Sequence, residues 1–251
     1  SSRRRHTRYI SVTRVQTCPL PIYLWVLNKP PGLLSAPGRG PDKQDCLSSR
    51  VQRADPNALL VHRLDQPTSG LMLMARNAPG HRLLNAAFAQ RQVSKTYLAV
   101  VDGLIDIDLP WSKIDAPIDL HWPDRPRHHV GPAGKPSQTW WRPLALDQAN
   151  RRTLVVLQPW TGRSHQLRLH MQWIGHPILG DTLYGPPELA QSSPRLLLHA
   201  WRLSLKHPVS GDNRTWSAPV PPEIQTGFCQ QAVVQRLHNA LITPNQETFY
   251  A

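Results

Sequence analysis

Residues 62–70 place three side chains capable of ionic or acid–base chemistry within a single turn. The run His62-Arg63-Leu64-Asp65 is followed by Gln-Pro-Thr-Ser-Gly and then by five apolar residues at 71–75. An apolar run after glycine predicts a buried strand, so we expect the charged cluster on a loop at the mouth of that strand. An aspartate beside Arg63 can stay ionised while partly removed from water, because a nearby opposite charge favours the charged form. Taken alone, the spacing favours a simpler arrangement, a loop salt bridge with a capping aspartate.

Residues 161–170, Thr-Gly-Arg-Ser-His-Gln-Leu-Arg-Leu-His, form a second polar cluster. Apolar residues recur at helical spacing from 167 to 174, and Gly175 is expected to end that helix. Arg163 then lies at or near the helix N-terminus, where capping or phosphate binding is the simple interpretation. The two histidines of the cluster are five residues apart and do not reproduce the His-Glu-x-x-His zinc pattern.

The remaining periodicity predicts both helices and strands. Strands are expected at 22–27, 93–101, 139–141, 153–157 and leading to 205, helices at 45–53, 78–92 and 232–241, and long surface loops over 104–137. Lys95, Tyr97 and Ala99 share one face of the strand at 93–101, where Tyr97 by spacing alone is an ordinary strand aromatic. The Asp and His residues of 104–137 stand between prolines at no recognised ligand spacing, so no metal site is predicted.

The charge balance indicates a polyanionic partner. The 251 residues carry a net charge of +13 and have a pI of about 10.5, which favours nucleic acid first and an anionic membrane second. The three cysteines are scattered and suggest neither a disulfide framework nor a zinc site, which favours a reducing compartment. No apolar run approaches the length of a membrane span. We therefore expect a cytoplasmic protein that acts on RNA or DNA and does not enter a membrane.

The expected organisation is one large domain with an addition at each end. Residues 1–18 are predicted to be a basic flexible arm, residues 19–222 the main domain, and residues 223–251 a C-terminal extension of unassigned role. No P-loop or dinucleotide fingerprint is present, so no cofactor is expected. Nothing in the sequence calls for an obligatory protein partner.

Several motifs, taken together and in order, resemble one enzyme family. These are Asn-Lys-Pro-x-Gly at 28–32, His-Arg-Leu-Asp with Thr-Ser-Gly at 62–70, Lys-x-Tyr-x-Ala at 95–99 and Gly-Arg-Ser-His-Gln at 162–166. They resemble the RluA-type pseudouridine synthases, over roughly residues 22–220. The resemblance implies an α+β fold with a mixed, mostly antiparallel bent sheet, flanked by helices and holding a central catalytic cleft. It also implies conversion of uridine to pseudouridine within structured RNA, without a cofactor or metal.

The resemblance also implies roles for individual residues. Asp65 is expected to be the catalytic carboxylate, Tyr97 to stack on the target base, and Arg163 to orient and ionise Asp65. Arg63 would enter the space left by the extruded base, while His62 would support the same turn. The further substrate-binding residues are Leu198, which would line the pocket, and Lys29, Lys95 and His165.

Two alternatives remain open at this point. A non-catalytic RNA-binding protein on the same fold would have the same basic charge, and a nucleosidase would use Asp65 for hydrolysis and release free uracil. One Asp rather than a spaced pair of carboxylates disfavours an ordinary glycosidase. The family's dual-specificity members further suggest the substrates, a uridine in a large-subunit (23S) rRNA hairpin and one in a tRNA anticodon loop.

Overall fold

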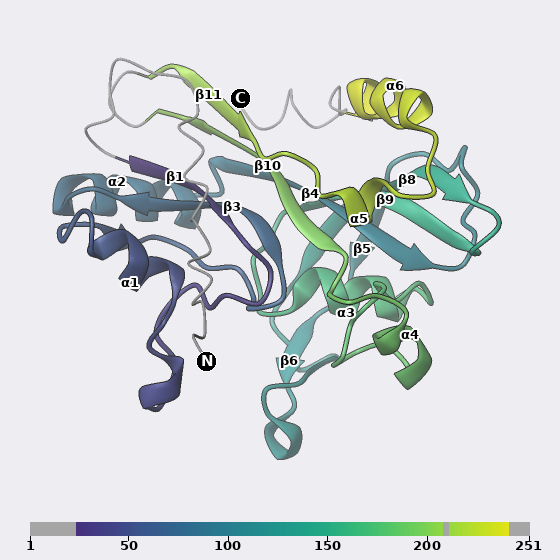
Figure 1. The fold of residues 1–251 in the computed structure, drawn as a ribbon, viewed down its shortest axis with the longest axis horizontal. Helices are drawn as coiled ribbons and strands as arrows, with labels where there is room; N and C mark the ends of the chain where they lie inside the picture. Colours follow the sequence, from purple (N-terminus) through teal and green to yellow (C-terminus); the bar gives the residue numbers. More distant parts are fainter. Residues whose placement is uncertain (1–23, 208–210, 241–251) are drawn as a thin grey trace, which may run out of the picture.

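A twisted main sheet of nine strands runs through the part of the chain that the structure describes (Figure 1). The computed structural model describes residues 24–207 and 211–240, with the side chains of 238–240 left out. Within these residues the main sheet has the strand order β1-β3-β10-β4-β9-β8-β5, with β2 paired to β3 and β11 to β10. All of its pairs are antiparallel except β3 with β10.

Strands and helices are interspersed along the chain, as in an α+β fold. The strands of the main sheet are β1 (Leu24–Lys29), β2 (Leu59–Leu60), β3 (Ser69–Ala75), β4 (Val93–Asp102), β5 (Ser112–Asp115), β8 (Gln138–Asp147), β9 (Arg152–Pro159), β10 (Leu198–Lys206) and β11 (Asn213–Ser217). A separate hairpin pairs β6 (Ile118–Leu120) with β7 (His128–Val130). The helices are α1 (Leu47–Gln52), α2 (Ala78–Ala89), α3 (Gln166–Trp173), α4 (Pro187–Gln191), α5 (Pro222–Gln225) and α6 (Gln230–Ala240), with 3-10 turns η1 (Pro41–Lys43) and η2 (Trp122–Asp124).

The parallel contact between β3 and β10 joins the two halves of the sheet. Only two residue pairs are in register there, Ser69 with His199 and Gly70 with Ala200. Gly70 has a φ of +111°, and a Cβ at this position would lie 2.2 Å from the carbonyl oxygen of Ala200. Gly70, which ends the motif at 62–70, is therefore required by the close approach of the two backbones, since any side chain would separate the strands.

Alternation along β4 divides the core into two layers. Leu98 and Val100 pack on one face with residues of β8 and β9 and with the C-terminal helices. Tyr97, Ala99 and Val101 face the opposite layer, which includes apolar residues of α3. The predicted alternation of this strand is confirmed, and it directs Tyr97 to the side of the sheet that carries α3.

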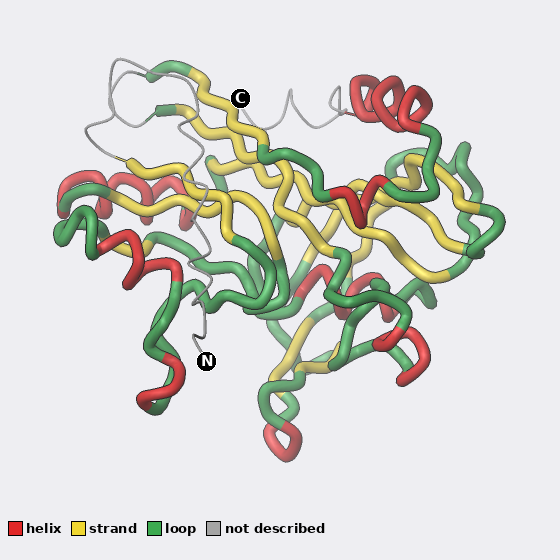
Figure 2. The backbone as a smooth tube through the Cα atoms, in the orientation of Figure 1, coloured by secondary structure: helices red, strands yellow, loops and turns green. Residues whose placement is uncertain are grey.

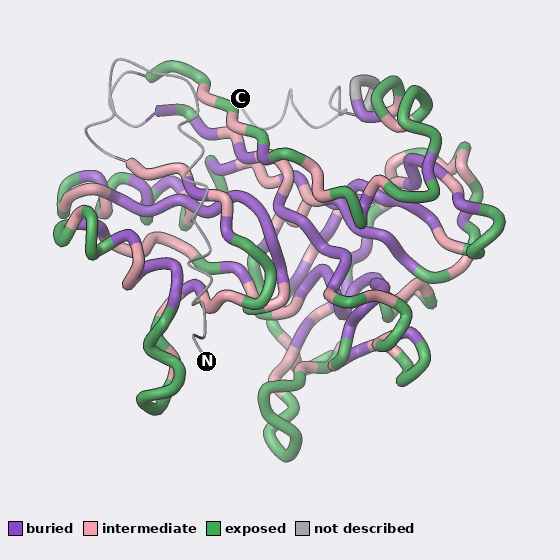
Figure 3. Tube along the Cα trace, viewed as in Figure 1, coloured by how far each residue is buried: buried purple, intermediate pink, exposed green. Residues whose placement is uncertain are grey.

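Helices lie around the sheet (Figure 2), and two exposed tips project from the same side of the molecule (Figure 3). One tip is the η1 loop before α1, and the other is the β6–η2–β7 hairpin, where Trp122 is 63% exposed beneath the Arg125 guanidinium. The sequence predicted surface loops throughout 104–137, and this prediction is wrong because the strands β5, β6 and β7 lie there. These strands are three or four residues long and separated by segments that contain proline, which weakens their periodic signal.

The other predicted elements are present with shifted ends. For α1 the N-cap is Cys46, whose sulfur accepts from the Ser49 N–H, while Asp45 pairs instead with Arg50. The predicted helix near residue 232 is α6. Residues after 222 also contribute to the core, because Ile224, Phe228 and Leu237 are buried against β4 and β8 side chains. The predicted arm at 1–18 lies outside the described residues.

In the ranges 24–207 and 211–240, no helix is both long enough and apolar enough to cross a lipid bilayer.

Candidate active site

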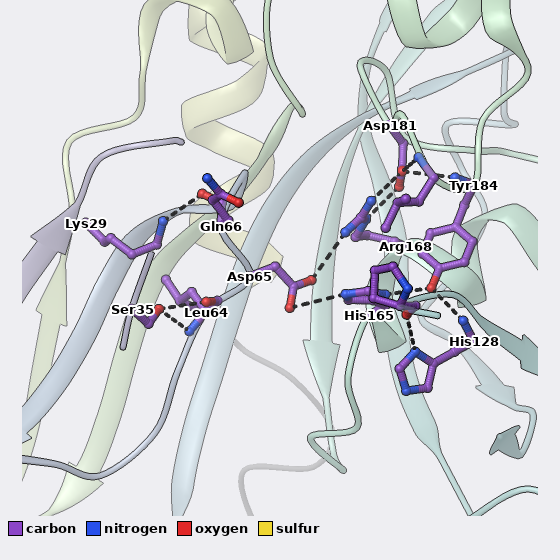
Figure 4. A network of polar contacts seen from close by, with 12 residues as sticks. Lys29, Ser35, Leu64, Asp65, Gln66, His128, His165, Arg168, Asp181 and Tyr184 are labelled. Carbon is purple, nitrogen blue, oxygen red and sulfur yellow. Dashed lines mark hydrogen bonds and ion pairs between the residues drawn. The ribbon is translucent and has the colours of Figure 1, made fainter. Parts of the chain in front are cut away.

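A pocket of about 320 Å³ lies where the loop before β3 faces the start of α3. This volume is within the range of small-ligand sites. Its lining includes every predicted site residue except Lys29, namely His62, Arg63, Asp65, Lys95, Tyr97, Arg163, His165 and Leu198. Segments about one hundred residues apart in the chain thus supply the two facing walls (Figure 4).

The loop wall is held by hydrogen bonds to its own backbone. The Ser35 hydroxyl donates to the Leu64 carbonyl at 2.6 Å and accepts from the Leu64 N–H at 3.0 Å. Lys29 Nζ donates to the carbonyls of Pro30, Leu33 and Gln66. These contacts fix the residues on both sides of Asp65, so its carboxylate projects from a rigid turn.

Lys29 supports this loop from below rather than lining the pocket. Its side chain is fully buried, and burial lowers the pKa of its ammonium to about 8, although the nearby Asp65 charge opposes that shift. Because all three of its contacts are backbone carbonyls, Lys29 acts as a support of the turn. Its predicted role in binding substrate stays a prediction, and the geometry favours an indirect contribution.

His62 is a neutral member of the loop wall. Its Nε2 accepts the Leu73 N–H at 2.9 Å and its ring stacks on Phe88. Burial lowers the pKa of His62 to about 3, with a further contribution from the Lys95 charge. An acceptor nitrogen and a strongly lowered pKa both require the uncharged ring. Arg63, by contrast, is exposed at the pocket rim.

The opposite wall is organised by the first residue of α3. Gln166 Oε1 accepts from the Thr161 hydroxyl at 2.7 Å and from the Arg163 N–H at 3.0 Å. Its Nε2 donates to the Gln138 carbonyl and the Thr139 hydroxyl on β8. Gln166, the last residue of the Gly-Arg-Ser-His-Gln motif, therefore ties the loop before α3 to the sheet.

Arg168 is the arginine that reaches Asp65. Its guanidinium forms a two-pronged ion pair with Asp181 at 2.8 and 2.6 Å, in which the side chains are only 2% and 1% exposed. Its Nη1 lies 3.6 Å from Oδ2 of Asp65, whose side chain is 28% exposed. His165 Nε2 lies 3.9 Å from the other oxygen, Oδ1. Both carboxylate oxygens of Asp65 thus face nitrogen atoms of the α3 wall.

This arrangement corrects one predicted role. Arg163 was expected to orient Asp65, but its Nε donates to the Pro136 carbonyl at 3.3 Å, and among the described residues the arginine in ion-pair contact with Asp65 is Arg168. The reason is geometric. Arg163 precedes the helix, whereas Arg168 lies within α3 on the side that faces the pocket.

A signal for Arg168 was present in the sequence. It stands between Leu167 and Leu169 on a short helix, and an arginine flanked by apolar residues is expected to be buried and paired. Its partner Asp181 also accepts hydrogen bonds from the Leu183 and Tyr184 N–H groups, so the guanidinium of Arg168 and two backbone donors share the carboxylate. Sequence reasoning named neither Asp181 nor Tyr184 as part of the site.

The remaining lining supplies an apolar wall and a cation. Leu198 is 3% exposed, and Tyr97 belongs to the same apolar layer. Burial raises the pKa of the Tyr97 hydroxyl, and the Asp65 charge adds to this, so the phenol stays protonated. Burial lowers the pKa of Lys95 to about 8, with a contribution from Arg91. The pocket therefore offers one carboxylate, a flat apolar surface and several cationic groups.

Comparison with known proteins agrees with this geometry. The profile of a family described as RNA pseudouridylate synthase matches residues 23–173. The dual-specificity RNA pseudouridine synthase RluA of Escherichia coli (strain K12) is 42% identical over 205 residues, covering 78% of this chain and 89% of that protein. The RluA of Pasteurella multocida (strain Pm70) is 44% identical over 195 residues, covering 77% and 88%. The solved structure of human RNA Pseudouridylate Synthase Domain Containing 1 has 27% identity and a TM-score of 0.70, covering 88% of this chain and 92% of that one.

The chain belongs to the RNA pseudouridine synthase family. Within that family it is of RluA type, and it is an enzyme that isomerises uridine in RNA. The predicted fold class is likewise confirmed, since the sheet is mixed, mostly antiparallel and flanked by helices.

Proposed function

We propose that Asp65 acts directly on the ribose of an extruded uridine. The observation that carries this assignment is its position: a partly exposed carboxylate, with Arg168 and His165 behind it and Tyr97 and Leu198 lining the same pocket. A carboxylate near the anomeric carbon can attack it, stabilise positive charge there, or remove a sugar proton. The buried ion pair of Arg168 with Asp181 supplies a rigid positive group next to that carboxylate.

The detached uracil must stay in place while it rotates and bonds again through C5. Tyr97 and Leu198 supply a flat apolar surface on which the ring can turn without escaping. Lys95, Arg63 and Arg163 line the same pocket and bring cations to the phosphates on either side of the target nucleotide. Arg63, exposed at the rim, is suited to fill the space that the base leaves.

We further propose that the substrates are a uridine in a large-subunit rRNA hairpin and one in a tRNA anticodon loop. The relatives at 42–44% identity are named dual-specificity enzymes, and the net charge of +13 suits folded RNA. Extruding a base from a loop costs a few kcal/mol, which phosphate contacts of the basic surface would offset. An enzyme with these substrates works in the cytoplasm.

The decisive experiment uses RNA hairpins carrying tritium at C5 of uridine. Re-bonding through C5 replaces that hydrogen, so we expect tritium release without chain cleavage or free uracil. The variant Asp65→Asn should retain RNA binding and lose turnover by at least about three orders of magnitude. Asp108→Asn is the matched control, because that carboxylate is 84% exposed and outside the pocket.

Other outcomes lead to different conclusions. Release of free uracil would indicate a nucleosidase, and RNA binding without tritium release from any cellular RNA would leave only a binding role. If Asp65→Asn turned over like the wild type, the assignment of the catalytic carboxylate would be wrong. Mapping pseudouridines in cells that lack the protein then identifies the uridines.

A further inference from the structure

A chain of polar contacts leads from the β6–η2–β7 hairpin to Asp65 (Figure 4). The His128 N–H on β7 donates to the Tyr184 hydroxyl at 3.0 Å. That hydroxyl lies 2.6 Å from Nδ1 of His165, whose Nε2 faces Oδ1 of Asp65 at 3.9 Å. The rings of His128 and Tyr184 also meet the His165 ring edge to face, with centroids at 5.2 and 5.5 Å. His165 is thus held on three sides.

The donors and acceptors of this chain define one tautomer of His165. The Tyr184 oxygen already accepts the His128 N–H, and its own hydrogen is available to Nδ1 of His165. Nδ1 is then the acceptor and Nε2 carries the hydrogen, which points toward the Asp65 carboxylate. The opposite tautomer would turn a nitrogen lone pair toward a negatively charged oxygen, so it is disfavoured.

The charges around His165 balance in favour of the neutral ring. Burial is the largest effect and lowers its pKa, the Asp65 and Asp181 charges raise it, and those of Arg168 and His128 lower it further. The titratable and charged groups that face the ring are Asp65, Arg168, His128, Asp181 and Tyr184. The net shift is downward, which agrees with an accepting Nδ1.

The backbone at His165 indicates that its position is imposed. Its φ is +56°, in the left-handed region that residues other than glycine adopt uncommonly, and it stands at the N-cap of α3. Such a conformation is energetically unfavourable and persists where the surroundings determine it, commonly at functional sites. A helix start without functional demands on it would be served better by Ser, Thr, Asp or Asn.

We propose that Tyr184 is a positioning residue that holds His165 as its neutral Nε2–H tautomer, and that this N–H and Arg168 together orient the two oxygens of Asp65. The inference rests on the proposed role of Asp65. A neutral donor orients the carboxylate while leaving its negative charge available for reaction. A histidinium there would form an ion pair and reduce the basicity and nucleophilicity of Asp65.

The first test does not depend on turnover. Nitrogen-15 NMR of the histidine-labelled full chain distinguishes the two neutral tautomers and the cation, and the His165 signals are identified by their loss in His165→Gln. We expect His165 as the Nε2–H tautomer from pH 6 to 8. In Tyr184→Phe its pKa should rise, because the hydrogen bond that favours the neutral ring is gone. A wild-type Nδ1–H tautomer or a cation at pH 7 would overturn the proposal.

The second test uses kinetics and a double variant. Tyr184→Phe should lower kcat about tenfold with KM changed less than about twofold, and should move the acid limb of the rate profile to higher pH. Gln at position 165 can present an amide N–H without a tautomer, so His165→Gln should lose less than His165→Ala. In the His165→Gln background Tyr184→Phe should cost less than about twofold. His176→Gln is the imidazole control, since that ring contacts the Asp102 carbonyl and does not line the pocket.

The results separate this inference from the proposed function. A tenfold loss in Tyr184→Phe that is equal at every pH and persists in the His165→Gln background would indicate a general structural role and refute the inference. A wild-type protein that releases no tritium would refute the proposed function instead, while leaving the NMR result intact. Melting curves identify any variant that fails to fold. For such a variant, the tautomer of His165 in the wild-type NMR spectrum decides whether the inference holds.

Discussion

The two walls of the pocket hold their reactive groups by different means. The loop wall positions Asp65 through hydrogen bonds to its own main chain, made by Ser35 and Lys29. The α3 wall positions its nitrogen atoms through a nearly fully buried ion pair between Arg168 and Asp181. One wall is thus held mainly by backbone contacts, and the other by charges that must be removed from water together.

The difference reflects what each wall has to do. The loop wall presents a negative group with part of its surface open to substrate, so its supports need only be rigid. The α3 wall places a positive charge next to that group at all times, and a buried guanidinium is tolerable only when a second carboxylate holds it. Asp181 therefore fixes Arg168, and Arg168 can then act on Asp65 without moving.

The largest expected effect separates the two arginines of the α3 wall, Arg163 and Arg168. Arg168→Lys keeps the charge but loses the planar fork that spans Asp181 and Asp65, so kcat should fall about a hundredfold. Arg163→Lys should change kcat less than about threefold, because its contact is a carbonyl at the pocket rim. Single-turnover rates measure both. An equal loss in Arg163→Lys would restore the original prediction from the sequence.

Removing one hydroxyl should test the loop wall. Ser35→Ala leaves both the N–H and the carbonyl of Leu64 without that partner inside the protein, at a cost of about 1–3 kcal/mol in the free energy of unfolding. Turnover should also fall, because the turn that carries Asp65 loosens. Denaturant unfolding measures the stability, with Ser204→Ala as the control at an exposed hydroxyl pair. Unchanged stability together with lower turnover would mean that Ser35 acts in catalysis and not as a support.

Stability should depend on pH through neutral buried histidines. The folded state lowers the pKa of His62 to about 3 and that of His199 to about 4, in both cases chiefly by burial. The unfolded chain takes up these protons near pH 6.5, so the stabilisation is complete above that pH and is lost as the pH falls toward 4 and 3. Each histidine contributes up to about 1.4 kcal/mol per pH unit to the slope of the unfolding free energy against pH. His62→Gln should therefore unfold with a shallower acid dependence, and an identical slope would contradict a neutral His62.

The smallest effect concerns RNA affinity alone. Lys95→Met should weaken binding and reduce the slope of log affinity against log salt by about one, as expected for one lost phosphate contact. Because its pKa is lowered to about 8, wild-type affinity should also fall between pH 7 and 9, and the variant should not show that fall. Lys113→Met is the control, an exposed lysine paired with Asp115. Filter binding at several salt concentrations distinguishes a phosphate contact from a purely structural lysine.

The sequence by itself determined the turn that carries Asp65, but not the supports of that turn, Ser35 and Lys29, whose contacts with it span 29 and 37 residues. Asp65, the turn around it, Gly70 and the alternation of Tyr97 along β4 follow from local patterns, because strand periodicity and turn residues act over a few positions. Family motifs added the reaction. The short strands at 112–130 were missed, since strands of three or four residues separated by proline-containing turns leave little pattern to recognise.

Only the tertiary structure decided the α3 wall. Which of two arginines five residues apart reaches Asp65 depends on where α3 begins, on Gln166 tying that start to β8, and on Asp181 meeting the guanidinium from beyond the helix. None of these contacts is local in the chain. The turn at Asp65 and the strand after it could be predicted because neighbouring residues determine both, whereas the position of a buried charge depends on the distant partner that the fold brings to it.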